Sequence, residues 1–134
     1  MAGPLILVVD DDFHITDLLE GLLRSQGFEV RVASDGDQAL DALADGRLPA
    51  LVLLDLMLPK KDGFVVLDSM RRDPRTKAIP VLVVSARDLV GDVDKAFAKG
   101  ATEFLIKPLH TDRLLAKIRK HLGGDPRPDL RPPA

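Results

Sequence analysis

The sequence predicts an α/β domain: a five-stranded, parallel, doubly wound sheet with helices on both faces. Short apolar runs alternate with helical patterns from residue 5 to about residue 122, as five successive strand–helix units require. Most of these runs are apolar without interruption, which is typical of parallel strands buried on both faces. Connections of this kind are right-handed, and the flavodoxin-like strand order 2-1-3-4-5 is the expected arrangement.

The first two units contain one buried strand and one half-exposed strand. Residues 5–9 form an apolar run, and the helical spacing of the leucines after it predicts a helix that Gly27 ends. Residues 28–32 alternate strictly between apolar and polar side chains. This strand is therefore expected at an edge of the sheet. Ser34 or Asp35 is expected to cap the helix that follows.

The third unit begins with the apolar run of residues 50–54, after Gly46 has ended the second helix. A loop then leads to a helix that is expected from about Gly63 to Arg72. Asp73-Pro74 ends this helix, because the residue before a proline disfavours the helical conformation. Residues 79–84 form the next apolar run and are the expected fourth strand.

The last two helices enclose the fifth strand. Apolar residues at helical spacing define the fourth helix, which ends at Gly100, and residues 102–106 form the fifth strand. Thr111 or Asp112 is expected to cap the last helix.

Composition and length exclude several classes of function. The 134 residues are expected to form one domain at 1–122, followed by a polar, disordered tail or linker stub at 123–134. The formal net charge of −2 gives no basic surface for nucleic acid. The chain has no cysteine, which excludes disulfides and thiolate chemistry. The first apolar stretch is only as long as a strand, so we expect neither a signal peptide nor membrane insertion, and a cytoplasmic location.

Polar side chains with useful chemistry follow the ends of four apolar runs. Asp10 and Asp11 follow the first strand, Asp55 the third, Ser85 the fourth and Lys107 the fifth. Since ligands bind outside the carboxyl ends of parallel strands, these groups are expected to meet at one rim of the sheet. Three crowded carboxylates repel one another unless a cation neutralises them, and such oxygen ligands suit Mg²⁺. A carboxylate beside Mg²⁺ can act as a nucleophile and accept a phosphoryl group.

This pattern resembles the receiver domain of two-component response regulators, of the single-domain type, over residues 5 to 122. The stretches that carry the resemblance are 7–12, 55–59, 62–63, 83–86, 100–101 and 104–108. The resemblance implies that Asp55 accepts the phosphoryl group, and that Asp11 binds Mg²⁺ directly while Asp10 helps to hold the metal through water. It also implies that Asp55 and the Met57 carbonyl are metal ligands. Ser85 and Phe104 would be the switch residues, and Lys107 the phosphate counter-ion. The peptide bond between Lys107 and Pro108 would be cis.

The same resemblance implies the partners. The phosphoryl donor would be a histidine kinase or a histidine phosphotransfer protein, and a downstream protein would read the face formed by the fourth helix, fifth strand and fifth helix. The chain would be a signalling switch that catalyses only its own phosphorylation and dephosphorylation, without direct contact to nucleic acid. Residues 73–76 and 79–81 are similar to those of single-domain and relay receivers. A receiver cut from a longer regulator at its linker is the alternative.

Several positions depart from the family pattern. Lys60-Lys61 replaces a small and an apolar residue before Asp62-Gly63, which adds positive charge near the site and would bias the choice of partner. Phe104 lacks the hydroxyl group that many relatives carry, so a switch through this residue would act by packing. Met57 and Arg87 would flank the phosphoryl group and hinder the attacking water, so we expect slow self-dephosphorylation.

Other charged residues are expected to have no special role. Taken without the resemblance, the pairs Lys60-Lys61 and Arg71-Arg72 are interpreted as solvated faces. His14, His110 and His121 share no metal-ligand spacing and are expected at the surface or at helix caps.

Two other functions fit part of the pattern. A metal-dependent phosphatase of the haloacid-dehalogenase type would use the same nucleophile, but it needs a second acid two residues later, where this chain has Met57. A phosphate-independent interaction module would keep only the receiver fold. The complete set of acids, hydroxyl and lysine argues against that module, and failure of Asp55→Asn to alter partner binding would favour it.

Overall fold

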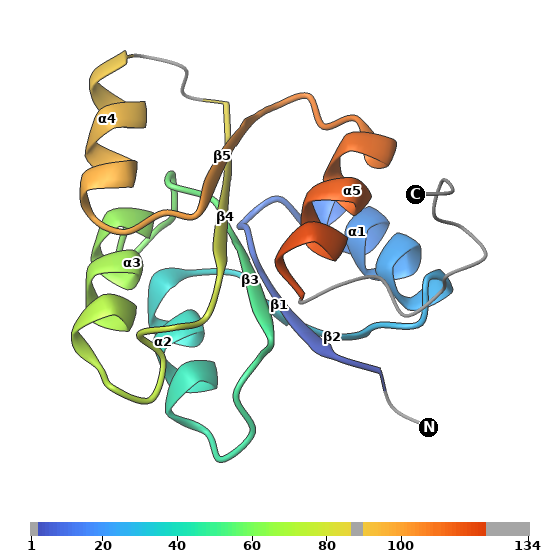
Figure 1. The fold of residues 1–134 in the computed structure, drawn as a ribbon, viewed down its shortest axis with the longest axis horizontal. Coiled ribbons are helices and arrows are strands. Elements are labelled where there is room, and N and C mark those ends of the chain that lie inside the picture. Colours follow the sequence, from blue (N-terminus) through green and yellow to red (C-terminus); the bar gives the residue numbers. More distant parts are fainter. Residues whose placement is uncertain (1–2, 87–89, 123–134) are drawn as a thin grey trace, which may run out of the picture.

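The computed structural model describes residues 3–86 and 90–122 and has the predicted architecture (Figure 1). Five parallel strands form one sheet in the order β2-β1-β3-β4-β5, which confirms the expected topology. The strands are β1 (Leu5–Val9), β2 (Glu29–Ala33), β3 (Leu51–Leu54), β4 (Val81–Ser85) and β5 (Glu103–Ile106). The helices are α1 (Phe13–Ser25), α2 (Gly36–Ala44), α3 (Gly63–Arg72), α4 (Val90–Ala98) and α5 (Thr111–His121).

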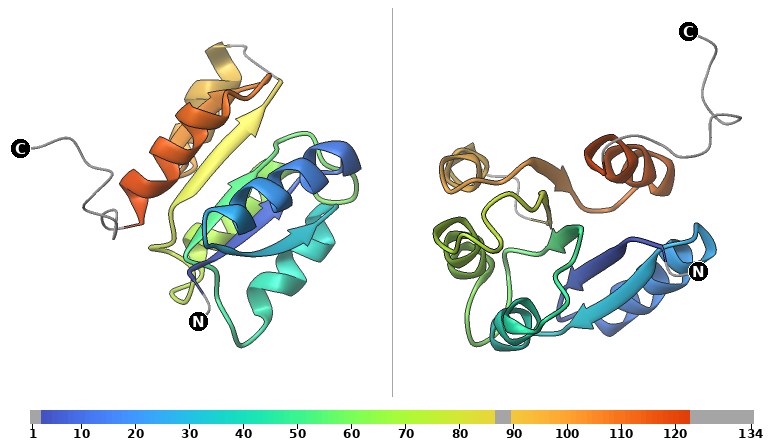
Figure 2. Two further views of the ribbon diagram at one scale, coloured as in Figure 1. Left: turned by 90° about the vertical axis from the view of Figure 1, so that its right-hand side faces the viewer. Right: turned by 60° about the horizontal axis from the view of Figure 1, so that its bottom comes forward.

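The sheet separates two layers of helices (Figures 1 and 2), and an apolar cluster lies on each of its faces. Helices α2, α3 and α4 cover one face, and α1 and α5 cover the other. Because successive strand residues point to opposite faces, Leu7 and Val9 pack under the first set of helices, whereas Ile6 and Val8 pack under the second. Strands β1, β3 and β4 are buried along their whole length, which explains their uninterrupted apolar sequences. Within the described ranges, every helix is too short or too polar to cross a lipid bilayer.

Aspartate side chains cap the first three helices. Asp12, Asp35 and Asp62 each accept a hydrogen bond from a backbone amide in the first turn, at 2.9, 2.7 and 3.1 Å. Of the two cap candidates for α2, Asp35 is therefore the cap. The Ser34 hydroxyl instead donates to the side chain of Gln38 at 2.9 Å, so each residue satisfies a different polar group at this helix start.

Several predicted boundaries were wrong: β2 lies one residue later than predicted, and β3 begins one residue later. The cap position of α5 is His110, which makes no side-chain cap bond, and Thr111 and Asp112 lie in the first turn instead. The Asp112 carboxylate still suits that place, because the N-terminal end of a helix carries partial positive charge. β4 begins at Val81, two residues later than predicted, because a turn and a proline precede it. β5 begins at Glu103, one residue later than predicted.

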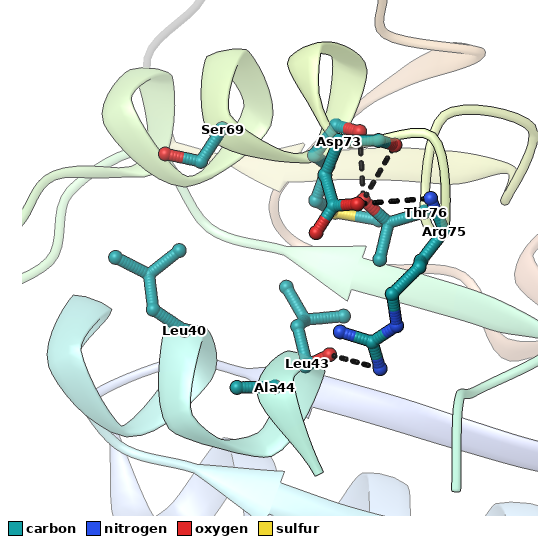
Figure 3. A pocket seen from close by; sticks show the side chains of 8 residues that line it. Leu40, Leu43, Ala44, Ser69, Asp73, Arg75 and Thr76 are labelled. Atoms are coloured by element: carbon teal, nitrogen blue, oxygen red, sulfur yellow. Dashed lines mark hydrogen bonds between the residues drawn. The ribbon is translucent and has the colours of Figure 1, made fainter. Parts of the chain in front are cut away.

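The ends of α2 and α3 meet at a small hollow of about 100 Å³ (Figure 3). The Thr76 hydroxyl donates to the Met70 carbonyl at 2.7 Å, so it pairs one of the carbonyls that the end of α3 leaves open. Arg75 reaches α2, where its guanidinium donates to the carbonyls of Leu43 and Asp45 at 3.4 and 3.1 Å. These contacts join two helix ends, so we interpret the hollow as a packing seam.

Arg71 joins three segments at the edge of the sheet where β4 and β5 begin. Its half-buried guanidinium donates to the carbonyls of Lys77, Ile79 and Gly100 at 3.1, 2.7 and 2.9 Å. Gly100 has a φ of +104°, and a Cβ at this position would lie 2.6 Å from Cγ of Arg71. Glycine therefore permits both the turn and the close approach. The interpretation of Arg71-Arg72 as a solvated pair was wrong for Arg71 and correct for Arg72, whose side chain is 79% exposed.

We expect Arg71→Met to lower the free energy of unfolding by about 2–4 kcal/mol, because three carbonyls lose their donor and two of these hydrogen bonds are partly buried. Arg72→Met is the matched control on the same helix and should change stability by less than about 0.5 kcal/mol. Urea unfolding of the two variants measures both values. An equal loss of stability in the two variants would contradict the role of Arg71 in joining the three segments.

Candidate functional site

Asp55 stands at the carboxyl end of β3, the central strand of the sheet. Its backbone amide donates to the Val9 carbonyl at 2.9 Å, which extends the pairing of β1 and β3 beyond the end of β3. The side chain is buried, and Oδ1 accepts a hydrogen bond from the Met57 amide at 3.0 Å. The sheet thus holds one carboxylate in a fixed position at its rim.

Asp10 and Asp11 follow β1, the strand beside β3. Asp10 is buried, and its Oδ1 accepts a hydrogen bond from the Asp12 amide at 2.9 Å. Asp11 is exposed. One carboxylate oxygen from each of Asp10, Asp11 and Asp55 lies within 4.8 Å of the other two. The structure therefore brings the three acids together, with Asp11 on the side that faces solvent.

Lys107 supplies the positive charge of this cluster. Its Nζ lies 2.7 Å from Oδ2 of Asp10 and 2.9 Å from Oδ2 of Asp55, and its side chain is only 16% exposed. The residue directly follows β5, and the peptide bond between Lys107 and Pro108 is cis. A partly buried ammonium in contact with both carboxylates offsets part of their mutual repulsion.

Burial and the ion pairs act against each other in the protonation of these groups. Burial raises the pKa of Asp10 above its ordinary value, although hydrogen bonds from Lys107 and the Asp12 amide act in the opposite direction. Burial alone would lower the pKa of Lys107, but its hydrogen bonds to Asp10 and Asp55 outweigh burial, and the pKa is raised. The ammonium is therefore firmly charged, whereas ionised Asp10 reduces the stability of the metal-free fold.

We expect Asp10→Asn to raise the free energy of unfolding of the metal-free protein at neutral pH by on the order of 1 kcal/mol. A raised pKa means that the folded state binds the proton of Asp10 more tightly than the unfolded chain does. The contribution of Asp10 to the stability of the parent is therefore most favourable below about pH 4. This contribution is lost as the pH rises through the pKa that Asp10 has in the folded state. The advantage of the variant should therefore shrink in acid.

Urea unfolding in EDTA, at about pH 7 and about pH 4.5, measures this difference. A variant that is less stable than the parent at neutral pH would show that the ion pair with Lys107 outweighs burial of the Asp10 carboxylate.

The carboxylate cluster fits a hard divalent cation. Three carboxylates and one ammonium leave two negative charges, which one divalent cation balances. The exposure of Asp11 leaves room for water or phosphoryl oxygens in the coordination shell, which Mg²⁺ prefers. The Met57 carbonyl, also expected as a ligand, belongs to the residue whose amide binds Asp55, so it lies on the same loop.

The two expected switch residues lie on neighbouring strands. Ser85 is the last residue of β4, is fully buried and pairs with Ile106 of β5. Its carbonyl accepts a hydrogen bond from the Lys107 amide at 2.9 Å, which links the ends of β4 and β5. Phe104 is half-buried and packs against the core under α2, α3 and α4. Arg87 lies outside the described residues.

Sequence reasoning missed two features of this rim. Phe13, the first residue of α1, is 74% exposed and lines a hollow of about 310 Å³ that Asp11 also lines. A phenylalanine at the start of an amphipathic helix gives no signal for this exposure. A Cβ on Gly63 would lie 2.3 Å from the carbonyl oxygen of Asp55, so the loop after β3 closes tightly on the site only with glycine there. The Asp62-Gly63 pair was the available signal.

Comparison with known proteins identifies the family of this chain. The family model "Response regulator receiver domain" matches residues 6–119. The transcriptional regulator RpaA of Synechocystis sp. is 44% identical over 116 residues, which are 87% of this chain and 48% of RpaA. Response regulator PleD of Caulobacter vibrioides is 43% identical over 114 residues, which are 85% of this chain and 25% of PleD.

The fold comparison gives the same result. The receiver domain of Francisella response regulator 1452 is similar with a TM-score of 0.81 and 28% identity, covering 90% of this chain and 97% of that domain. This chain spans between a quarter and about half of the length of the curated relatives named above.

Proposed function

Because the chain belongs to the response regulator receiver domain family of two-component systems, we propose that it is a switch controlled by phosphorylation of Asp55. The observation that carries the proposal is the cluster at the rim of the sheet, where Asp10, Asp11, Asp55 and Lys107 converge. The proposed unit spans residues 1–122 and acts in the cytoplasm, and residues 123–134 lie outside the described part of the chain.

In the proposed reaction, a carboxylate oxygen of Asp55 attacks the phosphorus of a phosphohistidine. The new P–O bond forms as the P–N bond breaks, and the imidazole of the donor leaves with the electron pair. Mg²⁺, held by Asp10, Asp11, Asp55 and the Met57 carbonyl, would neutralise charge on the phosphoryl oxygens. Lys107 already contacts Asp55, so its ammonium is in reach of the added negative charge. Because Ser85 ends β4, Lys107 follows β5 and the two are joined by a backbone hydrogen bond, a shift at either residue would reach both strands.

Incubation with acetyl phosphate and Mg²⁺, followed by measurement of intact mass, tests the proposal. We expect a gain of one phosphoryl group that depends on Mg²⁺. We also expect slow loss of that group, because Met57 is exposed at the rim two residues after Asp55 and would hinder the attacking water. A chain that gains no mass from acetyl phosphate, from phosphoramidate or from phosphorylated histidine kinases would contradict the proposal.

The donor protein must reach Asp55 from the open rim, and one apolar surface begins there. A groove of about 530 Å³ between α1 and α5 is lined by Lys107 and Pro108 at the rim and by leucines of both helices. Leu18 of α1 is 66% exposed beside this groove, although its helical spacing suggested core. An exposed apolar surface continuous with the site fits the proposed docking of a histidine kinase or histidine phosphotransfer protein.

We expect Leu18→Glu to slow phosphoryl transfer from a histidine kinase that phosphorylates the parent by about 10-fold or more, because a charge replaces an apolar contact. The rate with acetyl phosphate should stay unchanged, since a small donor needs no docking surface. Asp41→Asn, an exposed change on α2, is the control. If both donors slow equally, the residue acts on the site and not on docking.

The proposed output surface is formed by α4, β5 and α5. Phe97 of α4 and Ile106 of β5 are both exposed there, which gives a partner protein apolar contacts. Glu103 of β5 holds α5 in place: its carboxylate lies 3.4 Å from Lys117 and 2.8 Å from His121. The hydrogen bond from His121 lowers the pKa of Glu103 below its ordinary value. A change in β5 would therefore be passed to α5.

A further inference from the structure

The loop of residues 57–62 between β3 and α3 returns to the site where it begins. The Gly63 amide donates to the Leu56 carbonyl at 3.0 Å, and the Cα of Gly63 packs directly on the Asp55 carbonyl. Lys60 is three residues from this anchor. Because an extended chain spans at most about 3.6 Å per residue, the Cα of Lys60 lies within about 11 Å of Gly63.

A second set of contacts holds the same loop on α2. The amide of Gly36, the first residue of α2, donates to the Pro59 carbonyl at 3.3 Å. A Cβ on Gly36 would lie 1.9 Å from the Lys61 carbonyl oxygen, so this approach requires glycine. The Lys61 ammonium lies 4.0 Å from the carboxylate of Asp37. The loop is therefore fixed on two sides, and the charge of Lys61 has a partner.

Lys60 differs from Lys61 in backbone conformation and in charge pairing. Its φ is +68°, a left-handed conformation that is unfavourable for a residue with a Cβ. Its side chain is exposed, and no ion pair or hydrogen bond to its ammonium exists within residues 3–86 and 90–122. A fixed loop thus presents Lys60, whose ammonium has no ion pair among the described residues, on the segment that follows Asp55, at a strained backbone position of the kind that gathers at functional sites.

We propose that Lys60 is a specificity residue for phosphorylation, which favours donors of higher net negative charge. The inference rests on the proposed function of Asp55. Three carboxylates, Lys107 and one divalent cation sum to no net charge, so the field that an approaching donor meets is set by neighbours such as Lys60. One charge about 10 Å from a dianion changes the encounter rate by about 2- to 4-fold at low ionic strength.

The test compares initial phosphorylation rates of the parent and of Lys60→Gln and Lys60→Glu at saturating Mg²⁺. Glutamine keeps a long side chain and the same backbone demand while it removes the charge. Acetyl phosphate is the dianionic donor, and phosphoramidate is the donor with one net negative charge fewer. Lys61→Gln is the matched control in the same loop. Lys77→Gln is the control between α3 and β4, at the end of the sheet opposite to the carboxylates.

With acetyl phosphate at about 0.01 M ionic strength, Lys60→Gln should react about 2- to 4-fold more slowly and Lys60→Glu about 10-fold more slowly. The differences should be smaller with phosphoramidate and should vanish at about 0.5 M. Lys77→Gln should match the parent, and Lys61→Gln should change the rate less than Lys60→Gln does.

Equal rates for the parent and Lys60→Gln at low ionic strength would overturn the inference. A loss that persists unchanged at high ionic strength would also overturn it, because it would indicate a structural effect on the loop. Absence of phosphorylation in the parent with every donor would instead contradict the proposed function of Asp55, so the two failures are distinguishable.

Discussion

Asp55→Asn is expected to abolish the gain of a phosphoryl group from acetyl phosphate and Mg²⁺. The amide nitrogen and oxygen that replace the carboxylate are poor nucleophiles, and the neutral side chain removes one of the charges that attract the cation. Asparagine has nearly the same shape, and its oxygen can still accept the hydrogen bond from the Met57 amide. The fold should therefore persist while the chemistry is lost.

Asp41→Asn on α2 is the matched control for this experiment, because its carboxylate is exposed and has no contact with the cluster. Intact mass after equal incubation should show the phosphoryl group in the parent and in Asp41→Asn, and none in Asp55→Asn. A modified Asp55→Asn protein would show that another residue accepts the phosphoryl group. Unchanged partner binding by Asp55→Asn would favour the phosphate-independent module.

Lys107→Met is expected to have the second largest effect, on stability and on rate together. It leaves the buried carboxylates of Asp10 and Asp55 without their counter-charge, which should lower the free energy of unfolding of the metal-free protein by about 2–4 kcal/mol. Loss of a positive charge beside the reacting oxygen should also slow phosphorylation by about 100-fold.

Rescue experiments separate this electrostatic role from simple packing. Mg²⁺ should restore part of the lost stability, because the cation replaces the missing charge. Acid should do the same: Lys107 lowers the pKa of Asp10, so without it Asp10 binds its proton more tightly in the folded state and the deficit shrinks as the pH falls. Lys117→Met, whose lysine pairs with Glu103 at the surface, should cost less than about 1 kcal/mol. A deficit that neither Mg²⁺ nor acid reduces would assign Lys107 to packing alone.

The fold could be predicted because buried strands leave a plain signal in the sequence. β1, β3 and β4 are covered on both faces, so every residue in them is apolar except Ser85 at the end of β4. The sequence carries no comparable signal for which helix residues are exposed to solvent. Leu18 has the spacing of a core residue, yet it is exposed beside the α1–α5 groove. Helical periodicity assigns a face to each residue, but the neighbouring element decides how far that face is covered.

The candidate site was predictable where it depends on strand ends and unpredictable where it depends on loops meeting. Asp10, Asp55 and Lys107 follow three strands of one parallel sheet, so the topology alone brings them together. The contact of Gly36 with the Lys61 carbonyl joins the start of α2 to the loop after β3, and no periodicity in the sequence encodes it. Similarly, neighbouring arginines look alike in sequence, and only the carbonyls around Arg71 distinguish it from Arg72.

The contacts of Arg71 also determine how α4 can move. By holding Gly100, Arg71 fixes the end of α4 that is far from the carboxylates, whereas the helix begins on the side where β4 delivers Ser85. A helix of nine residues is about 13 Å long. A rotation of about 10° about the fixed end would therefore displace the other end by about 2 Å. With Gly100 as the fixed point, a small displacement beside the proposed phosphorylation site would become a tilt of the exposed surface of α4.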